Sequence, residues 1–367
     1  MSRADVVVVG GGVIGCAVAR ALARAGVGAM VLERDEPGTH ASWAAAGMLS
    51  PLAEADGAGP FLRLLRESRR LYPRFVEELE AEAGMGVEYR DEGTLLVSLR
   101  EADDADLEER YRWQTAAGLP VERLSASETR ALEPALSSAV RWALRFPEDH
   151  QVENRLLARA LWLAAVRAGA EVRTGAEVRE IVGAGGRVRG VALASGERVE
   201  ADAVVVAAGC WAGRLGGLPS PPPVEPVHGQ LVAIEAPGSL RHVVDSERAY
   251  LVPRSDGRIL VGATMESTGF RRAVTAAGVL ALLAGALEIA PGLRDAPIVE
   301  HWSGLRPGTP DGLPILGPDP GLDGLFYAAG HFRNGILLTP ITAEIIRDLV
   351  LRGASDRDLA PYSILRF

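Results

Sequence analysis

Two arginines stand in segments where no nearby residue of the sequence can neutralise them. Arg306 lies in GLRPG and Arg333 in HFRNG, and the first acidic residues that follow them are Asp311 and Glu344. Burying an unpaired guanidinium is costly, so each arginine should have a counter-ion. A guanidinium binds a carboxylate through two parallel hydrogen bonds of defined geometry. We therefore expect Arg306 and Arg333 to bind the carboxylate of a small substrate, although an ion pair with a distant protein carboxylate stays open.

A glycine motif near the start of the chain indicates a nucleotide ligand. Gly10, Gly12 and Gly15 form G-x-G-x-x-G between the apolar run DVVVV and an alanine- and arginine-rich segment that favours a helix. The first glycine permits a tight turn, the second lets a pyrophosphate approach the backbone, and the third lets the helix pack on the strand. The helix N-terminus offers free N–H groups to the phosphates. Glu33 ends the next strand, at the distance where a carboxylate meets a ribose hydroxyl.

The segment after Glu33 favours FAD over NAD. It reads THASWAAAGMLSP, and its small residues offer backbone N–H groups without bulk beside a large flat ring. Two more predicted strands, at 204–211 and 327–331, contain Ala-Ala-Gly where they end. Parallel strands that end in glycine beside one crevice fit a ligand longer than a nucleotide.

The composition excludes several classes of chemistry. The chain has no lysine, and all 39 basic residues are arginine, which excludes a P-loop and any Schiff base. The six histidines lie far apart and no CxxC or HExxH spacing occurs, so we expect no metal site. The formal net charge of −9 disfavours nucleic acid as a partner.

The length of the chain and its apolar runs indicate the number of domains and the expected location of the protein in the cell. At 367 residues the chain suggests two domains. No apolar run reaches the length of a membrane span, and the first one, 6–9, is too short for the core of a signal peptide. We therefore expect a cytoplasmic protein that binds no membrane. Cys16 and Cys210 are too few for a disulfide framework and are interpreted as packing residues.

The elements that must position these residues form first an alternating and then a mostly extended pattern. The proline-rich segment 218–226 is interpreted as a connector between the two parts. Strands are expected between 171 and 209 and, in antiparallel order with a hairpin turn at Asp256-Gly257, between 228 and 308. Helices are expected over 61–83, 101–117, 153–168 and 271–289, after the capping-box pair Ser125 and Glu128, and from Thr339-Pro340 onward.

Five motifs connect the sequence with a known family: VVVVGGGVIG, SWAAAGML, AYLVPRSDGRILVGATME, GLRPGTPDGLPILG and AAGHFRNGILLTP. Through them, from end to end, the chain resembles the D-amino-acid-oxidase-like family of FAD-dependent amine oxidases, above all its glycine oxidases of the thiamine pathway. The resemblance implies the fold class α/β plus α+β. A Rossmann-like FAD-binding domain would comprise 1–85, 150–220 and 310–367. A substrate-binding domain with a mixed, largely antiparallel sheet would comprise 86–149 and 221–309.

The resemblance also implies which residues contact the substrate and the cofactor. The substrate would be held by Tyr250, Arg306 and Arg333, with Met265 lining the pocket. The residues expected at the FAD, including those of the glycine motif and of the strand ends, are Gly10, Gly12, Val13, Ile14, Gly15, Glu33, Arg34, Ala41, Ser42, Ala46, Gly47, Met48, Val178, Gly209, Gly330, His331, Phe332, Arg333, Asn334, Gly335, Ile336 and Leu337.

The implied reaction is oxidative deamination of glycine and similar small amines, namely sarcosine and small D-amino acids, by hydride transfer to flavin N5. The partners would be a small amino acid and molecular oxygen, the products the oxo acid, ammonia and hydrogen peroxide, and the imine would serve thiamine thiazole synthesis. Relatives attach the flavin through a cysteine near GLRPG and use a lysine to activate oxygen. This chain has Pro307 there and no lysine. Its FAD should therefore be bound non-covalently. The sequence does not identify the group that assists the reaction with oxygen. Whether the chain forms a homo-oligomer stays open.

Three other functions stay open on the sequence. The first is a D-amino-acid or N-methyl-amino-acid dehydrogenase that passes electrons to an acceptor other than oxygen. The second is a flavoenzyme that modifies the tRNA wobble base, against which the acidic charge argues. The third is a flavin- or nucleotide-binding regulatory protein without turnover, against which the two motif arginines argue.

Overall fold

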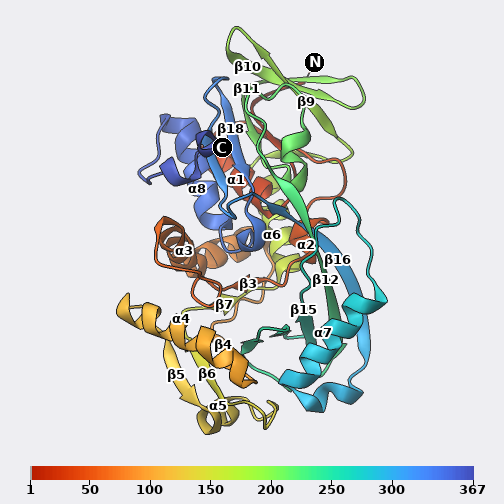
Figure 1. Cartoon of the computed structure of the whole chain (residues 1–367). Helices are drawn as coiled ribbons and strands as arrows, with labels where there is room; N and C mark the ends of the chain where they lie inside the picture. The colour runs from red at the N-terminus through yellow and green to blue at the C-terminus, as the bar shows by residue number, and fades with distance from the viewer. Residues whose placement is uncertain (1) are drawn as a thin grey trace.

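Residues 2–367 are described by a computed structural model, in which most strands belong to two eight-stranded sheets. In Figure 1 the first sheet, with β11 (Arg198–Val206) and β18 (Leu325–Ala329), occupies the upper half of the molecule. The second sheet, with β12 (Glu225–Glu235) and β16 (Ile298–Gly308), lies in the lower half. Across residues 2–367, no helix combines the length and apolar character needed to cross a membrane.

The first sheet is built around the predicted strand–helix–strand unit. β1 (Ser2–Val9) leads through the glycine motif into α1 (Val13–Arg24), and β2 (Ala29–Leu32) pairs with β1 in parallel. The strand order is β17–β18–β11–β1–β2–β8, with β10 and β9 continuing from β11. The remaining strands are β8 (Glu171–Arg173), β9 (Val178–Ala184), β10 (Arg187–Leu193) and β17 (Ile315–Pro318).

Both faces of β1 are buried, which explains its run of valines. Val6 and Val8 belong to a core formed with the helices α1, α3 (Pro60–Ala83), α6 (Asn154–Arg167) and α8 (Thr339–Arg352). Val7 and Val9 belong to a second core on the opposite face, formed with the strands β9 to β11. Because successive side chains of a strand point to opposite faces, one uninterrupted apolar run stabilises both layers.

The second sheet has the order β16–β12–β15–β14–β13–β4–β6–β5. Only β13 and β4 pair in parallel, so the sheet is mixed and largely antiparallel, as predicted. The hairpin predicted at Asp256-Gly257 joins β14 to β15. Helix α7 (Ala276–Ile289) packs against the sheet through Leu282, Ala286 and Ile289. The remaining strands of this sheet are β4 (Thr94–Ser98), β5 (Glu122–Ser125), β6 (Trp142–Phe146), β13 (Val243–Asp245), β14 (Tyr250–Pro253) and β15 (Arg258–Gly262).

Short elements complete the chain, and most predicted helices are present. Ser125 caps α5 (Ala126–Leu132) in the predicted capping box with Glu128. The helix predicted from 271 begins five residues later, because Thr275 caps α7 through the N–H of Gly278. The other short elements are α2 (Ala41–Ala44), β3 (Met48–Leu49), α4 (Asp104–Ala116), β7 (His150–Gln151) and the 3₁₀ turns Glu101–Asp103, Gly209–Arg214, Pro291–Asp295, Phe332–Asn334, Ala360–Tyr362 and Ile364–Arg366.

The fold class is confirmed: a Rossmann-like unit of parallel strands and helices stands beside a second, mixed sheet. Strands of the first sheet lie within 1–85, 150–220 and 310–367, and strands of the second within 86–149 and 221–309. The domain boundaries drawn from the sequence stay a proposal. This arrangement places the carboxyl ends of β1, β2, β11 and β18 opposite the strands β12, β14 and β16.

Candidate active site

A cavity of about 650 Å³ is lined by residues of both sheets. Its size is typical of a cofactor or ligand site. It collects most of the residues proposed from the sequence. Those that line it are Gly10, Gly12, Val13, Ile14, Glu33, Arg34, Ala41, Ser42, Ala46, Gly47, Met48, Val178, Gly209, Tyr250, Arg306, Gly330, His331, Phe332, Arg333, Gly335 and Ile336.

The glycine motif packs as the sequence predicts. Gly10 has a φ of +106°, and a Cβ there would lie 2.6 Å from the carbonyl oxygen of Ala207. A Cβ on Gly15 would lie 1.9 Å from the carbonyl oxygen of Gly10, so α1 could not approach β1 with any side chain at that position. Gly15 therefore shapes the site without lining it. Gly12 has no side chain to cap α1, and the hydroxyl of Ser42 accepts the N–H of Val13 at 3.1 Å. The other N–H groups of the first turn remain for a phosphate.

Glu33 is held by two backbone donors. One carboxylate oxygen accepts the N–H of Gly11 at 2.7 Å, and the other accepts the N–H of Asp35 at 2.9 Å. Glu33 is buried at the end of β2 and lines the cavity. A carboxylate oxygen has a second lone pair, so Glu33 can still accept a hydrogen bond from a ribose hydroxyl. These observations fit the adenosine half of FAD.

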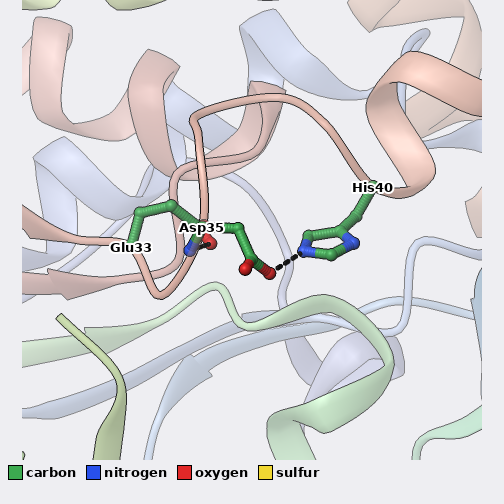
Figure 2. A group of neighbouring side chains, drawn as sticks. All are labelled: Glu33, Asp35 and His40. Carbon is green, nitrogen blue, oxygen red and sulfur yellow. Dashed lines mark hydrogen bonds and ion pairs between the residues drawn. The ribbon is translucent and has the colours of Figure 1, made fainter. Parts of the chain in front are cut away.

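The same carboxylate belongs to a group that resembles a metal site. Glu33, Asp35 and His40 each offer one ligand atom within 4.8 Å of one another, and Figure 2 shows them around one loop. His40 Nε2 lies 2.7 Å from a carboxylate oxygen of Asp35, the contact dashed in Figure 2. Because these ligand atoms already take part in hydrogen bonds and Glu33 faces the nucleotide end of the cavity, we interpret the group as part of the nucleotide site. The expectation of no metal stays a prediction.

The loop that lines the cavity between α2 and β3 is held by a buried arginine. Arg254, 6% exposed, donates to the carbonyl oxygens of Ala46 at 2.7 Å and Val152 at 3.0 Å, and to the amide oxygen of Asn154 at 3.0 Å. Burial lowers the pKa of Arg254 to about 10, so the guanidinium stays charged at neutral pH. Asn154 in turn donates to the carbonyl oxygen of Ser42 at 2.9 Å. Arg254 lies inside the motif AYLVPRSDGRILVGATME but was not among the residues predicted for the site.

Arg306 is the arginine best placed to bind an anion that enters the cavity. It donates to the carbonyl oxygen of Thr264 at 3.2 Å, and within residues 2–367 no carboxylate lies within 4.0 Å of its guanidinium. A Cβ on Gly229 would lie 2.2 Å from this guanidinium, so the glycine makes its position possible. Tyr250 lies beside it. Burial raises the pKa of Tyr250 to about 12 although Arg306 opposes the shift, so the phenol is neutral and can donate a hydrogen bond.

Arg333 differs from the expectation, because it has a protein carboxylate. Its Nε lies 3.6 Å from a carboxylate oxygen of Glu54, and its side chain is 38% exposed. Of the two possibilities that the sequence leaves open, the ion pair with a distant protein carboxylate is therefore present at Arg333. The partner comes from the loop between β3 and α3, far from Arg333 in the sequence. Glu54 also lines the cavity and was missed. One feature of the sequence could have identified Glu54: it is a single acidic residue among apolar ones in LAEA, directly after the segment predicted to lie beside the flavin.

Three further residues proposed for the site lie elsewhere. The pocket-lining position of Met265 is wrong: it lies outside the cavity lining and is 61% exposed, on the loop that follows β15. Leu337 is buried in the helical core, where its carbonyl oxygen accepts the hydroxyl of Ser68 at 2.6 Å. Asn334 is buried beside the cavity but does not line it.

His331 and Phe332 line the cavity through a constrained backbone. His331 is buried, its Nε2 lies 3.0 Å from the hydroxyl of Thr342, and burial lowers its pKa to about 3, so the ring is neutral. Phe332 has a φ of +47°, a conformation that a bulky L-residue rarely adopts. Strain of this kind persists where the surrounding structure imposes it, often at functional sites.

Glu33→Ala should weaken FAD binding by about 1.5–3 kcal/mol, the range for a hydrogen bond to a charged group. Titration of apoprotein with FAD measures this loss, and the affinity of the loaded enzyme for its amino acid should hardly move. Glu36→Ala is a matched control, because it removes the carboxylate of an exposed glutamate on the same loop that does not line the cavity. An unchanged FAD affinity in Glu33→Ala would show that Glu33 does not bind the ribose.

Comparison with known proteins extends over the whole chain. The DAO family model, described as FAD dependent oxidoreductase, matches residues 5–349. The glycine oxidase of Geobacillus kaustophilus is 40% identical over 371 residues, which cover 99% of this chain and 97% of that protein. Its crystal structure has a TM-score of 0.95 and covers 100% of both chains. The bifunctional protein ThiO/ThiG of Trichormus variabilis is 40% identical over 369 residues, 99% of this chain and 55% of that protein. A match of this extent places the chain in the DAO family of FAD-dependent oxidoreductases, with FAD as its cofactor.

Proposed function

We propose that this enzyme oxidatively deaminates glycine and similar small amines, among them sarcosine and small D-amino acids, to the oxo acid, ammonia and hydrogen peroxide. The observation that carries the proposal is Arg306, a cavity-lining guanidinium without a carboxylate partner within residues 2–367, beside the neutral phenol of Tyr250. Such a pair is suited to a carboxylate, the group that all these substrates share.

The relatives support the same substrate class. One relative is a glycine oxidase and another is the bifunctional protein ThiO/ThiG. We infer that the imine formed from glycine serves the synthesis of the thiamine thiazole. The proposal extends to molecular oxygen as the electron acceptor. A dehydrogenase that passes its electrons elsewhere is the alternative.

The residues of the chain bind and orient the substrate. Bound FAD supplies the redox chemistry, which is acceptance of a hydride from the substrate Cα. Arg306 would bind the carboxylate with two hydrogen bonds, and Tyr250 would donate a third. A carboxylate fixed in this way sets the direction of the Cα–H bond, and such positioning accounts for a large part of many rate enhancements.

The FAD is proposed to be non-covalent. Cys210 is a cysteine that lines the cavity, but it lies in the turn after β11 and not in the GLRPG segment. Burial raises the pKa of its thiol to about 12, so it carries no nucleophilic thiolate at neutral pH.

The experiment that tests the function is anaerobic reduction of the purified, FAD-loaded enzyme. Glycine, sarcosine and D-alanine should bleach the flavin, and each should yield one hydrogen peroxide per amine in air. L-alanine should react far more slowly, because a fixed carboxylate lets only one enantiomer direct its Cα–H bond toward the ring. Equal rates for D- and L-alanine would contradict the clamp, and flavin reduction without peroxide would favour the dehydrogenase.

A further inference from the structure

Glu54 lies in the loop between β3 and α3, in surroundings that fix its direction. Its neighbours Leu52, Ala53 and Ala55 are buried and belong to an apolar cluster with the strands β4 and β6. Glu54 lines the cavity, whereas Asp56, two residues later, is exposed and does not. The loop therefore directs one of its two acids inward.

Hydrogen bonds hold this loop on both sides of Glu54. The buried carboxylate of Asp149 accepts the N–H groups of Leu52 at 3.1 Å and Ala53 at 2.8 Å. Gln114, also buried, donates to the carbonyl oxygen of Leu52 at 2.9 Å. Arg110 donates to the carbonyl oxygen of Ala55. These bonds fix the backbone on both sides of Glu54, so its side chain begins from a fixed position in the cavity wall.

The Glu54 carboxylate has an electrostatic partner but an incomplete set of hydrogen bonds. Its Oε2 is buried, has no hydrogen-bond partner within residues 2–367, and lies 3.6 Å from Nε of Arg333. Burial raises the pKa of Glu54, whereas the nearby Arg333 and Arg306 lower it. The Glu54 carboxylate therefore lies near the same two arginines that are proposed to bind the substrate carboxylate.

The net charge of the side chains at this end of the cavity restricts how many carboxylates the substrate can carry. Arg306 and Arg333 contribute two positive charges and Glu54 contributes one negative charge, so one substrate carboxylate completes the balance. A second carboxylate on the substrate would meet Glu54 at short range in a partly buried site, where like charges repel strongly.

We propose that Glu54 determines specificity by neutralising Arg333, so that the enzyme accepts amines with one carboxylate and rejects those with two. The inference rests on the proposed function, because it deepens the substrate class of the same site. It predicts that removing the charge of Glu54 converts Arg333 into a binding group for a second carboxylate.

The test compares matched substrates in Glu54→Gln, which keeps the shape and removes the charge. Iminodiacetate is paired with sarcosine, and D-aspartate with D-alanine, because each pair differs by a carboxylate group. The ratio of kcat/KM for iminodiacetate over sarcosine should rise about tenfold or more, and the D-aspartate ratio should rise in the same direction. Asp56→Asn, which removes a charge from the exposed acid of the same loop, should leave both ratios unchanged.

A second measurement does not depend on turnover. Acetate and malonate should perturb the flavin absorbance when they bind, and Glu54→Gln should gain affinity for malonate relative to acetate. If the wild-type enzyme oxidises no amine, the proposed function fails, and this titration still decides the role of Glu54. Unchanged ratios would overturn the inference. An equal loss of kcat/KM on all amines would also overturn it, because Glu54 would then bind the substrate amine. Loss of flavin in both Glu54→Gln and Glu54→Ala would overturn it as well, because Glu54 would then support the fold.

Discussion

Replacing Arg306 by alanine is expected to lower kcat/KM for glycine by about 30- to 4,000-fold while FAD stays bound. Removing one member of a desolvated, hydrogen-bonded charge pair typically costs about 2–5 kcal/mol, and each 1.4 kcal/mol corresponds to roughly tenfold in rate. Arg306 is placed for such a pair, since Gly229 makes room for its guanidinium and no protein carboxylate within residues 2–367 lies within 4.0 Å. The measurement is steady-state kinetics at equal flavin content.

Arg333→Ala is the natural comparison for that variant. The sequence suggests a loss on the same scale for both arginines, but the structure lowers the expectation for Arg333. Its side chain is 38% exposed and already faces Glu54, and partly exposed ion pairs contribute less. Arg306 should therefore be the stronger anchor. A larger loss in Arg333→Ala, or near-normal kinetics in Arg306→Ala, would mean that the carboxylate binds elsewhere.

Arg254→Met is expected to destabilise the protein by at least about 3 kcal/mol, because three buried acceptors lose their donor and each unsatisfied group costs about 1–3 kcal/mol. The acceptors are the carbonyl oxygens of Ala46 and Val152 and the amide oxygen of Asn154. Methionine retains much of the side-chain length, so the change isolates the guanidinium. Since Ala46 belongs to the loop that lines the cavity, FAD affinity should fall together with stability.

Urea unfolding of the apoprotein and titration with FAD measure these two effects. Arg74→Met is the control, because Arg74 is 86% exposed in an ion pair with Glu78. Exposed pairs of this kind contribute about 0–1 kcal/mol. If Arg254→Met unfolds like the control, water replaces the guanidinium and the arginine does not hold the loop.

Much of the fold and of the nucleotide end could be predicted because the signals are local. Glycine is required at positions 10 and 15 because a side chain there would clash with backbone a few residues away or on an adjacent strand. The run of valines in β1 is explained by burial of both faces of that strand. The capping box of Ser125 and Glu128 is likewise complete within one helical turn. The short strands β4, β5, β6 and β13 were not individually identified, because their place in the sheet depends on partners distant in the sequence.

The substrate end shows what sequence spacing cannot decide. The sequence by itself predicted that Arg306 and Arg333 need an anion, and the family resemblance added Tyr250 beside them. Only the tertiary structure decided that Arg333 meets Glu54, that Arg306 does not meet a carboxylate among residues 2–367, and that Met265 points away. The reason is physical: an ion pair depends on distance through space, and the tertiary fold brings the loop that carries Glu54 to Arg333 while Asp149 holds the backbone of that loop.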